Sequence, residues 1–184
     1  MTTTGIDRAA LVRRAMVDLV AERGIHGTSM SDIAERAGVA TGTAYVHYGS
    51  KAELLVAAFA EVKAGLGRAA MAGIDLSLEA REIFDSVWRG IHSHLTADPA
   101  IARFLVQIEV SPLKESAHAA LSGNDPLNQT AQTLSAQLVD LPLTVLYDLC
   151  LAPAVRLVAS DEDLSPSEID TLIESCWRAV ARST

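Results

Sequence analysis

Residues 27–53 of this chain read GTSMSDIAERAGVATGTAYVHYGSKAE. Ser29 stands three positions before Asp32, a spacing that lets a hydroxyl and a carboxylate cap the start of a helix. That helix is short, because Gly38 favours the left-handed backbone conformation in which helices end. A second short helix is expected from about residue 41 to residue 48. The stretch therefore predicts two short helices joined by a tight turn.

Small residues flank the glycine at the spacing that a helix-turn-helix needs. Ala34 lies four residues before Gly38, and Ala44 lies six residues after it. The first alanine lets the two helices cross closely, and the second packs into the angle between them. We predict a helix-turn-helix motif over about 29–48.

The rest of the chain is expected to be helical as well. Apolar residues recur at helical spacing nearly everywhere, and no alternating run typical of a strand occurs. Ser50 and Glu53 form a second capping pair, which predicts a connecting helix over 51–71. The predicted fold is all-α with about nine helices. We expect two domains: residues 1–51, which hold the helix-turn-helix, and a larger helical domain over residues 52–184.

The composition fits a helical globular protein, with 49% hydrophobic, 21% charged and only 4% aromatic residues. No apolar stretch approaches the length of a membrane span. The N-terminus lacks the apolar core of a signal peptide. Cys150 and Cys176 stand in apolar helical contexts and are expected to be core thiols. A cytoplasmic protein without a membrane partner is expected.

The net charge of −8 is unfavourable for a nucleic-acid binder, but it is unevenly distributed. Residues 1–51 hold six Lys or Arg and five Asp or Glu, so their net charge is +1. Residues 52–184 hold nine and eighteen, so their net charge is −9. A near-neutral N-terminal part attached to an acidic remainder permits DNA binding through the N-terminal part alone.

Over about residues 7–62 the chain closely resembles the DNA-binding segment of the TetR family of repressors. The resemblance is carried by Thr28-Ser29-Met30, Ile33-Ala34, Ala37-Gly38-Val39, Gly42-Thr43, Tyr45, His47-Tyr48 and Ser50-Lys51. It implies that the second helix of the motif lies in the major groove of DNA. The side chains that would face base edges are Thr41, Gly42, Thr43, Tyr45 and Val46. Those that would contact phosphates are Ser29, Ser31, His47 and Lys51.

The chain departs from the family pattern around this second helix. Ala40 stands where a serine is usual, so Thr41 becomes the candidate cap, and Ala44 stands where a leucine is usual. By helical phase Tyr48 falls near Ala44 and is expected to be buried, whereas Tyr45 points away from it. The helix holds no Lys or Arg. We therefore predict few ionic phosphate contacts and a salt dependence of binding shallower than about −6 per dimer on logarithmic axes.

The resemblance also implies that residues 1–51 are a DNA-binding domain and that residues 52–184 are a ligand-binding and dimerisation domain. It further implies a homodimer that binds an inverted-repeat operator in double-stranded DNA and responds to a small-molecule effector. The last two helices would form the dimer interface; they are expected at about 142–159, with a kink at Pro153, and at about 166–182. Candidate interface residues are Leu146, Leu157, Ile169, Ile173, Cys176, Trp177 and Val180. A cavity for a small hydrophobic molecule is expected among the central helices. Its candidate lining residues are Phe84, Trp88, His92, Phe104, Gln107, Glu109 and Tyr147.

No arrangement of residues indicates catalysis, a metal site or a cofactor. His92 and His94 stand two positions apart on a helix, so their side chains diverge and a shared metal is not expected. The leading interpretation is a ligand-responsive transcriptional repressor that is not an enzyme. The alternative is a helical small-molecule-binding protein with little DNA affinity. The near-neutral N-terminal part and the absence of Lys and Arg from the second helix leave that alternative open.

Overall fold

The computed structural model describes residues 7–121, 132 and 134–182. Every element within these residues is helical, apart from an isolated bridge between Leu138 and Ala181. The helices are α1 (Arg8–Arg23), α2 (Met30–Arg36), α3 (Thr41–His47), α4 (Lys51–Met71), α5 (Ala80–Ala97), α6 (Pro99–Glu109), α7 (Lys114–Ala119), α9 (Leu143–Cys150), α10 (Ala152–Ala159) and α11 (Pro166–Val180). The expected all-α fold is confirmed, with ten helices in this part of the chain against about nine expected.

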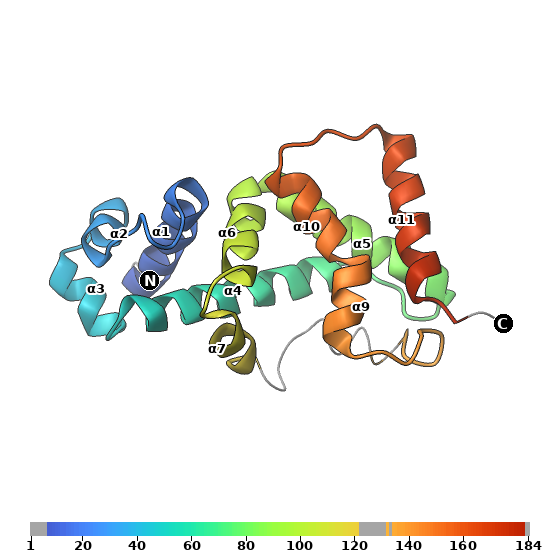
Figure 1. Ribbon diagram of the computed structural model, residues 1–184, viewed down its shortest axis with the longest axis horizontal. Coiled ribbons are helices and arrows are strands. Elements are labelled where there is room, and N and C mark those ends of the chain that lie inside the picture. The colour runs from blue at the N-terminus through green and yellow to red at the C-terminus, as the bar shows by residue number, and fades with distance from the viewer. Residues whose placement is uncertain (1–6, 122–131, 133, 183–184) are drawn as a thin grey trace, which may run out of the picture.

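The molecule has two parts that one long helix joins (Figure 1). Helices α1, α2 and α3 gather at one end and are called the head below. Helices α5 to α11 form the other part, called the body. Helix α4 begins just after α3 and runs from the head into the body (Figure 1). The boundary expected after residue 51 falls at the first residue of this connecting helix.

The head also touches the body directly, because α1 packs against α6 as well as against α4. Arg14 of α1 forms an ion pair with Asp98, which precedes α6, and a second hydrogen bond joins the two side chains at 3.2 Å. At the other end of α6, the side-chain oxygen of Gln107 lies against Gly24, 3.4 Å from where a Cβ would be. The position of the head is therefore tied to the position of α6.

Helices α4 and α5 cross so closely that the crossing requires a glycine. A Cβ on Gly90 would lie 2.6 Å from the carbonyl oxygen of Ala69 on α4. No real Cβ approaches a backbone atom so closely, so any side chain at this position would push the two helices apart.

The C-terminal part of the body differs in detail from the expectation. The helix expected over 142–159 is two helices, α9 and α10, which are separated at Leu151. Pro153 stands in the first turn of α10, where its missing amide hydrogen leaves no helical hydrogen bond unmade. The expected kink is thus a complete break. Helix α7 was not expected. Apolar residues also recur at helical spacing between residues 127 and 138, and this stretch lies largely outside the described residues.

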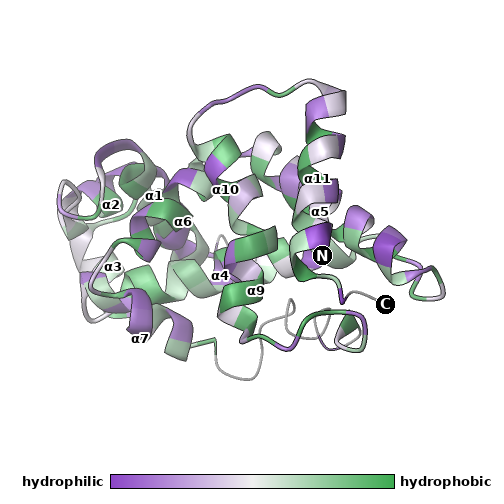
Figure 2. Cartoon of the chain, turned by 45° about the vertical axis from the view of Figure 1, so that its right-hand side comes forward, coloured by the Kyte–Doolittle hydropathy of each residue, from purple (hydrophilic) through white to green (hydrophobic). Residues whose placement is uncertain are grey.

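Most helices carry both hydrophobic and hydrophilic residues, shown in green and purple in Figure 2. Such amphipathic helices bury their apolar faces against one another and form a core. Among the described helices, none combines the length and the apolar composition that crossing a membrane requires.

Candidate nucleic-acid interface and internal cavity

The helix-turn-helix is built as the sequence indicates. The Asp32 amide donates to the Ser29 hydroxyl oxygen at 3.2 Å, and the Ser29 amide donates to the Asp32 carboxylate at 2.9 Å, so the capping box is complete. Gly38 has a φ of 66°, in the left-handed region. Ala34 and Ala44 are both buried where the two helices meet. These contacts fix the orientation of α3 relative to α2.

Helix α3 turns one face to solvent. Tyr45 is 51% exposed, whereas Tyr48 is only 7% exposed, as helical phase predicts. Thr41, Gly42, Val46 and His47 are exposed as well, and Thr43 is half-buried. The capping role expected for Thr41 is wrong: α3 begins at Thr41 itself, and Ala40 precedes it as a cap without a side-chain hydrogen bond. The residues expected to face base edges therefore share one accessible surface, apart from the half-buried Thr43.

Tyr48 anchors the end of α3 to the rest of the molecule. Arg13 of α1 donates a hydrogen bond to the Tyr48 hydroxyl at 2.6 Å. The same guanidinium forms an ion pair with Glu61 of α4, and the Tyr48 hydroxyl donates to the carbonyl oxygen of Ala9 at 3.4 Å. Helices α1 and α4 are thus joined next to the end of α3. No short-range sequence pattern indicates this network, because its members are far apart along the chain.

Lys51 has an internal role that the sequence did not indicate. Its ammonium donates to the carbonyl oxygens of Ile25 and Thr28, both at 2.9 Å, and ties the loop between α1 and α2 to the start of α4. Ser29 is engaged by Asp32, and these hydrogen bonds hold the pKa of the Asp32 carboxyl below its ordinary value. A phosphate at either residue would compete with these contacts. Ser31 and His47 are exposed at the surface.

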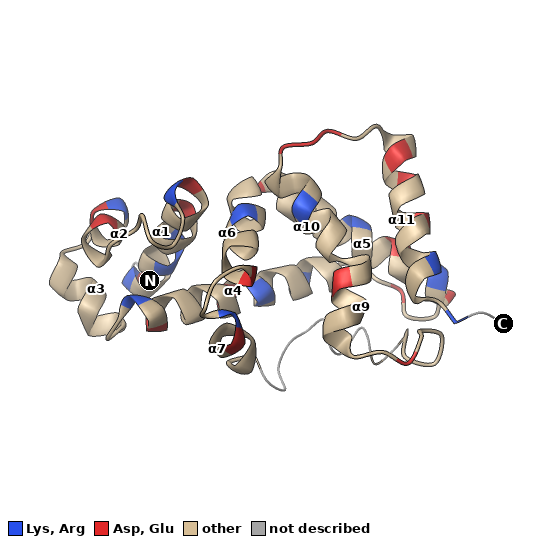
Figure 3. Ribbon diagram, viewed as in Figure 1, with Lys and Arg blue, Asp and Glu red and all other residues tan. Residues whose placement is uncertain are grey.

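The head carries little uncompensated positive charge. Figure 3 shows Lys and Arg next to Asp and Glu on α1 and α2, and neither kind on α3. Of the six Lys and Arg in residues 1–51, four are held by contacts within the protein: Arg13 with Glu61, Arg14 with Asp98, Arg36 with Glu22, and Lys51 with two carbonyls. The head can therefore offer few ionic contacts to phosphates without breaking its own.

The body contains a cavity of about 620 Å³ between α4, α5, α6, α7 and α9. Among the expected lining residues, Phe84, Glu109 and Tyr147 stand on its wall. Trp88, His92, Phe104 and Gln107 do not, and the expectation is corrected for these four. Trp88 and Phe104 are fully buried in the core, His92 stacks on Trp88 with ring centroids 5.3 Å apart, and Gln107 lies against Gly24 of the head.

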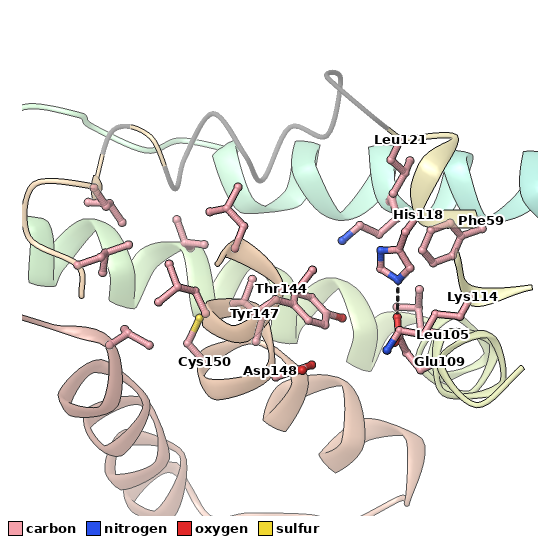
Figure 4. Close-up of a pocket in the computed structure, with 18 of the residues that line it drawn as sticks. Phe59, Leu105, Glu109, Lys114, His118, Leu121, Thr144, Tyr147, Asp148 and Cys150 are labelled. Carbon is pink, nitrogen blue, oxygen red and sulfur yellow. Dashed lines mark hydrogen bonds and ion pairs between the residues drawn. The ribbon is translucent and has the colours of Figure 1, made fainter. Parts of the chain in front are cut away.

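Charged and polar side chains gather at one end of the cavity (Figure 4). Glu109 forms an ion pair with Lys114 at 2.7 Å and accepts a hydrogen bond from the His118 ring at 2.8 Å. Burial alone would raise the pKa of Glu109, but these two hydrogen bonds outweigh it and hold the pKa below its ordinary value. The wall also includes Lys63, whose ammonium lies 4.8 Å from the centre of the Tyr147 ring. Sequence reasoning missed Lys63, Lys114 and His118.

The residues expected at the dimer interface pack largely inside the protomer itself. Ile173, Cys176 and Val180 of α11 are buried, as are Leu146 and Leu157. Ile169 and Trp177 are half-buried, and Trp177 packs against Phe84 of α5 with ring centroids 5.3 Å apart. The interface therefore stays a prediction, and its buried candidates pack within the protomer. The exposed apolar residues of this region lie on and just before α9: Leu141, Leu143, Val145 and Leu149.

The two cysteines fit the expectation of apolar surroundings. Cys176 is buried, and Cys150 is half-buried on the cavity wall. Burial raises the pKa of the Cys150 thiol to about 12. Both thiols are therefore protonated near neutral pH and poor nucleophiles.

Known proteins resemble this chain along its whole length. The model of the family described as bacterial regulatory proteins, tetR family, matches residues 12–58. An uncharacterised HTH-type transcriptional regulator of Haemophilus influenzae is 27% identical over 181 residues, covering 96% of this chain and 97% of that protein. The crystal structure of a TetR-family transcriptional regulator from Haemophilus influenzae matches with a TM-score of 0.81 at 25% identity, over 98% of this chain and 100% of the other. A structure from Shewanella sp. PV-4 with the same family name matches with a TM-score of 0.80 at 25% identity, over 96% and 99% of the two chains.

Proposed function

We propose that the chain is a TetR-family regulator and acts as a homodimeric repressor that a small apolar molecule releases from its operator. The proteins that it resembles are DNA-binding transcriptional regulators and not enzymes. The observation that carries the proposal is the exposed face of α3 on a helix-turn-helix whose capping box, turn and buried alanines are all in place.

The exposed face of α3 is the surface that reads the operator in this proposal. A recognition helix enters the major groove with its outward side chains against base edges. The hydroxyl of Thr41 can bond to either kind of base, and the methyl groups of Val46 can contact thymine methyls. Gly42 carries no side chain that would hold the helix away from the DNA. Ser31 and His47, which are exposed beside this face, supply phosphate contacts that fix the register.

The dimer interface in this proposal is the exposed apolar surface of α9 with the adjoining edge of α11. Val145 and Leu149 lie one turn apart on α9, and both are exposed in the protomer. Leu172 is half-buried on α11, which packs against α9. Two heads held at a fixed spacing are needed to read two half-sites about one helical turn apart, and a symmetric dimer supplies that spacing.

An oligomer measurement tests this interface. Leu149→Glu places a charge in the apolar contact and is expected to convert the dimer into a monomer in light scattering. The matched control is Leu76→Glu, since Leu76 is also an exposed apolar leucine and lies in the loop between α4 and α5. It should leave the mass unchanged. A Leu149→Glu variant that remains dimeric would place the interface elsewhere.

Helix α6 connects the cavity to the head. Leu105 and Glu109 line the cavity, whereas Gln107 and the preceding Asp98 contact α1 of the head. A molecule that displaces α6 therefore changes the position of α1 as well. Release from DNA additionally requires that this molecule bind the DNA-incompetent arrangement more tightly, since equal affinity for both arrangements would shift nothing.

The repressor proposal is tested first by selecting bound sequences from a random duplex library at a stated moderate salt concentration. Enrichment of one inverted repeat is expected. With that operator in hand, Val46→Ala should weaken binding several-fold because it removes methyl groups from the groove face. Val110→Ala is the matched control, because Val46 is 83% exposed and Val110 is 78% exposed in the body. Tyr45→Ala should weaken binding by about tenfold or more.

A helical small-molecule-binding protein with little DNA affinity is the second candidate, and the internally paired cations of the head favour it. If this candidate is right, the selection returns no enriched motif. DNA binding is then weak, depends on the salt concentration and does not depend on the DNA sequence. The repressor reading predicts a motif together with a salt slope shallower than about −6 per dimer. The selection from the random duplex library therefore distinguishes the two candidates.

A further inference from the structure

The cavity is polar at one end and apolar along the rest of its wall. Glu109, Lys114 and His118 lie together at one end, Cys150 lies at the other side, and Tyr147 lies between (Figure 4). The remaining wall is largely aliphatic, and it includes Val87 of α5, Leu134 and Leu138 from the segment before α9, and Leu143 and Leu146 of α9. A volume of about 620 Å³ lies within the range of about 300–1,000 Å³ that small-molecule sites occupy. Such a cavity suits a molecule with one polar group and an apolar tail.

Lys63 brings a positive charge to this wall. It is 5% exposed and is the one charged side chain in the described part of the chain that is buried. Its stem starts from the buried face of α4, one turn after Phe59, and its ammonium lies over the Tyr147 ring at 4.8 Å. The face of an aromatic ring attracts a cation. An interaction between two charges is much stronger in such surroundings than in water.

The acidic groups of the cavity do not offer an equivalent site for a cation. The Glu109 carboxylate is already shared between Lys114 and His118. Glu115 and Asp148 are exposed, so water and salt screen their charges. Among the described residues of the wall, the charged side chain that is buried is thus a cation, and an ammonium has three N–H donors to share between partners.

We propose that the cavity binds an elongated apolar carboxylate, whose head group accepts a hydrogen bond from the Lys63 ammonium and whose tail lies along the aliphatic wall. The inference rests on the proposed ligand-sensing role of the cavity. Beyond that role, the inference specifies that the ligand is an anion and that Lys63 recognises its charge. Binding of the carboxylate adds a charge-assisted hydrogen bond to the contact that Lys63 makes with Tyr147.

The test compares decyl compounds that share one alkyl chain and differ in the head group. Decanoate, decanol and decyltrimethylammonium are titrated into the full-length protein by calorimetry, below the concentrations at which they form micelles. A hydrogen bond to a charged group predicts that decanoate binds about 10- to 100-fold more tightly than decanol. The cation should bind least tightly. Equal or tighter binding of decanol or of the cation, or no binding by any of the three, would overturn the proposal.

Variants of α4 assign the preference to one side chain. Lys63→Met keeps the apolar stem and removes the charge, so it should bring the affinities for decanoate and decanol to within about threefold of each other. Lys63→Arg should keep most of the preference. Arg68→Met is the matched control, because Arg68 is an exposed cation on the same helix outside the cavity. A Lys63→Met protein that folds and still prefers decanoate contradicts the assignment. If Lys63→Met does not fold, the comparison of ligands on the wild type and on Lys63→Arg decides.

Release of the operator is measured separately from binding. A carboxylate that binds through Lys63 and leaves the protein on DNA contradicts the proposed ligand-released repressor, but not the chemistry of the cavity. Release by decanol with no preference for decanoate contradicts the carboxylate and leaves the repressor intact. The two proposals can therefore fail independently.

Discussion

Replacement of Gly42 by alanine should move stability and DNA affinity in opposite directions. Gly42 lies within α3, and no atom of the protein lies within 4 Å of the Cβ that alanine would add. The new methyl group therefore meets only solvent in the free protein. Alanine is favoured over glycine inside a helix by about 0.8–1.0 kcal/mol. For a chain of this length we expect the midpoint of thermal unfolding to rise by about 2–4 °C.

The same methyl group stands on the face of α3 that we place against the bases. If the backbone approaches the groove closely at Gly42, the methyl group holds the helix away from the DNA. A loss of about 1.4 kcal/mol is expected, which corresponds to a tenfold increase in Kd. Fluorescence anisotropy with the selected operator, at one stated salt concentration, measures this change. A stabilised Gly42→Ala protein that binds the operator like the wild type would refute the placement of this face on DNA.

Gly38→Ala is the control within the same motif. An added Cβ at Gly38 also meets nothing within 4 Å, but the residue has a φ of 66°. Left-handed backbone costs a residue with a side chain about 1–2 kcal/mol. Gly38→Ala should therefore unfold at a lower temperature than the wild type, although neither substitution creates a clash. Equal shifts at both positions would mean that the turn does not have the left-handed conformation.

Two further predictions concern the crossing of α4 and α5 and the ion pair between the head and α6. Gly90→Ala should destabilise the protein, because its Cβ would lie 2.6 Å from the Ala69 carbonyl oxygen. The clash should cost about 1–3 kcal/mol in free energy of unfolding, and the higher helix propensity of alanine should offset about 1 kcal/mol of that. Gly65→Ala in the same crossing, where the nearest atom would be 3.5 Å away, should instead stabilise it, and urea denaturation of both compares the signs. The Arg14 guanidinium holds the pKa of Asp98 below its ordinary value, so this ion pair contributes stability above about pH 4, and the contribution is lost as the pH falls through the lowered pKa. Asp98→Asn should accordingly be less stable than wild type near pH 7 and converge with it in strong acid; a constant difference across this range would contradict the ion pair.

The local features of the head could be predicted from the sequence because they depend on neighbours along the chain. The capping box of Ser29 and Asp32, the left-handed turn at Gly38 and the burial of Ala44 each follow from residue types at fixed spacings. The role of Lys51 does not. Its ammonium contacts two carbonyls more than twenty residues earlier in the chain, and no short-range pattern reports such a contact.

The body was less predictable, because an apolar stripe does not say what it packs against. Ile173 and Val180 lie on the most regular stripe of the chain, and they face the core of their own protomer. Trp88 and Phe104 were expected to line the cavity because aromatic side chains often do so, but here they fill the core. One feature of the cavity could have been recognised in the sequence. Lys63 stands one turn after Phe59 on the apolar face of α4, where a charged residue is unexpected.

In the proposed dimer, a carboxylate site in each protomer would give the ligand a preference large enough to switch the protein. Moving a two-state protein from about 1:99 to about 99:1 requires a ligand that prefers one state by about ten-thousand-fold. One charge-assisted contact supplies at most about a hundredfold, which a monomer with one cavity could not convert into a complete switch. A symmetric dimer has two cavities, and the preferences multiply when both heads change together. If the ligand reaches Lys63 only when α6 has moved away from its DNA-competent position, two contacts of about a hundredfold each give the required ten-thousand-fold. A monomeric variant such as Leu149→Glu should therefore bind the carboxylate with ordinary affinity but respond to it along a shallow, non-cooperative curve.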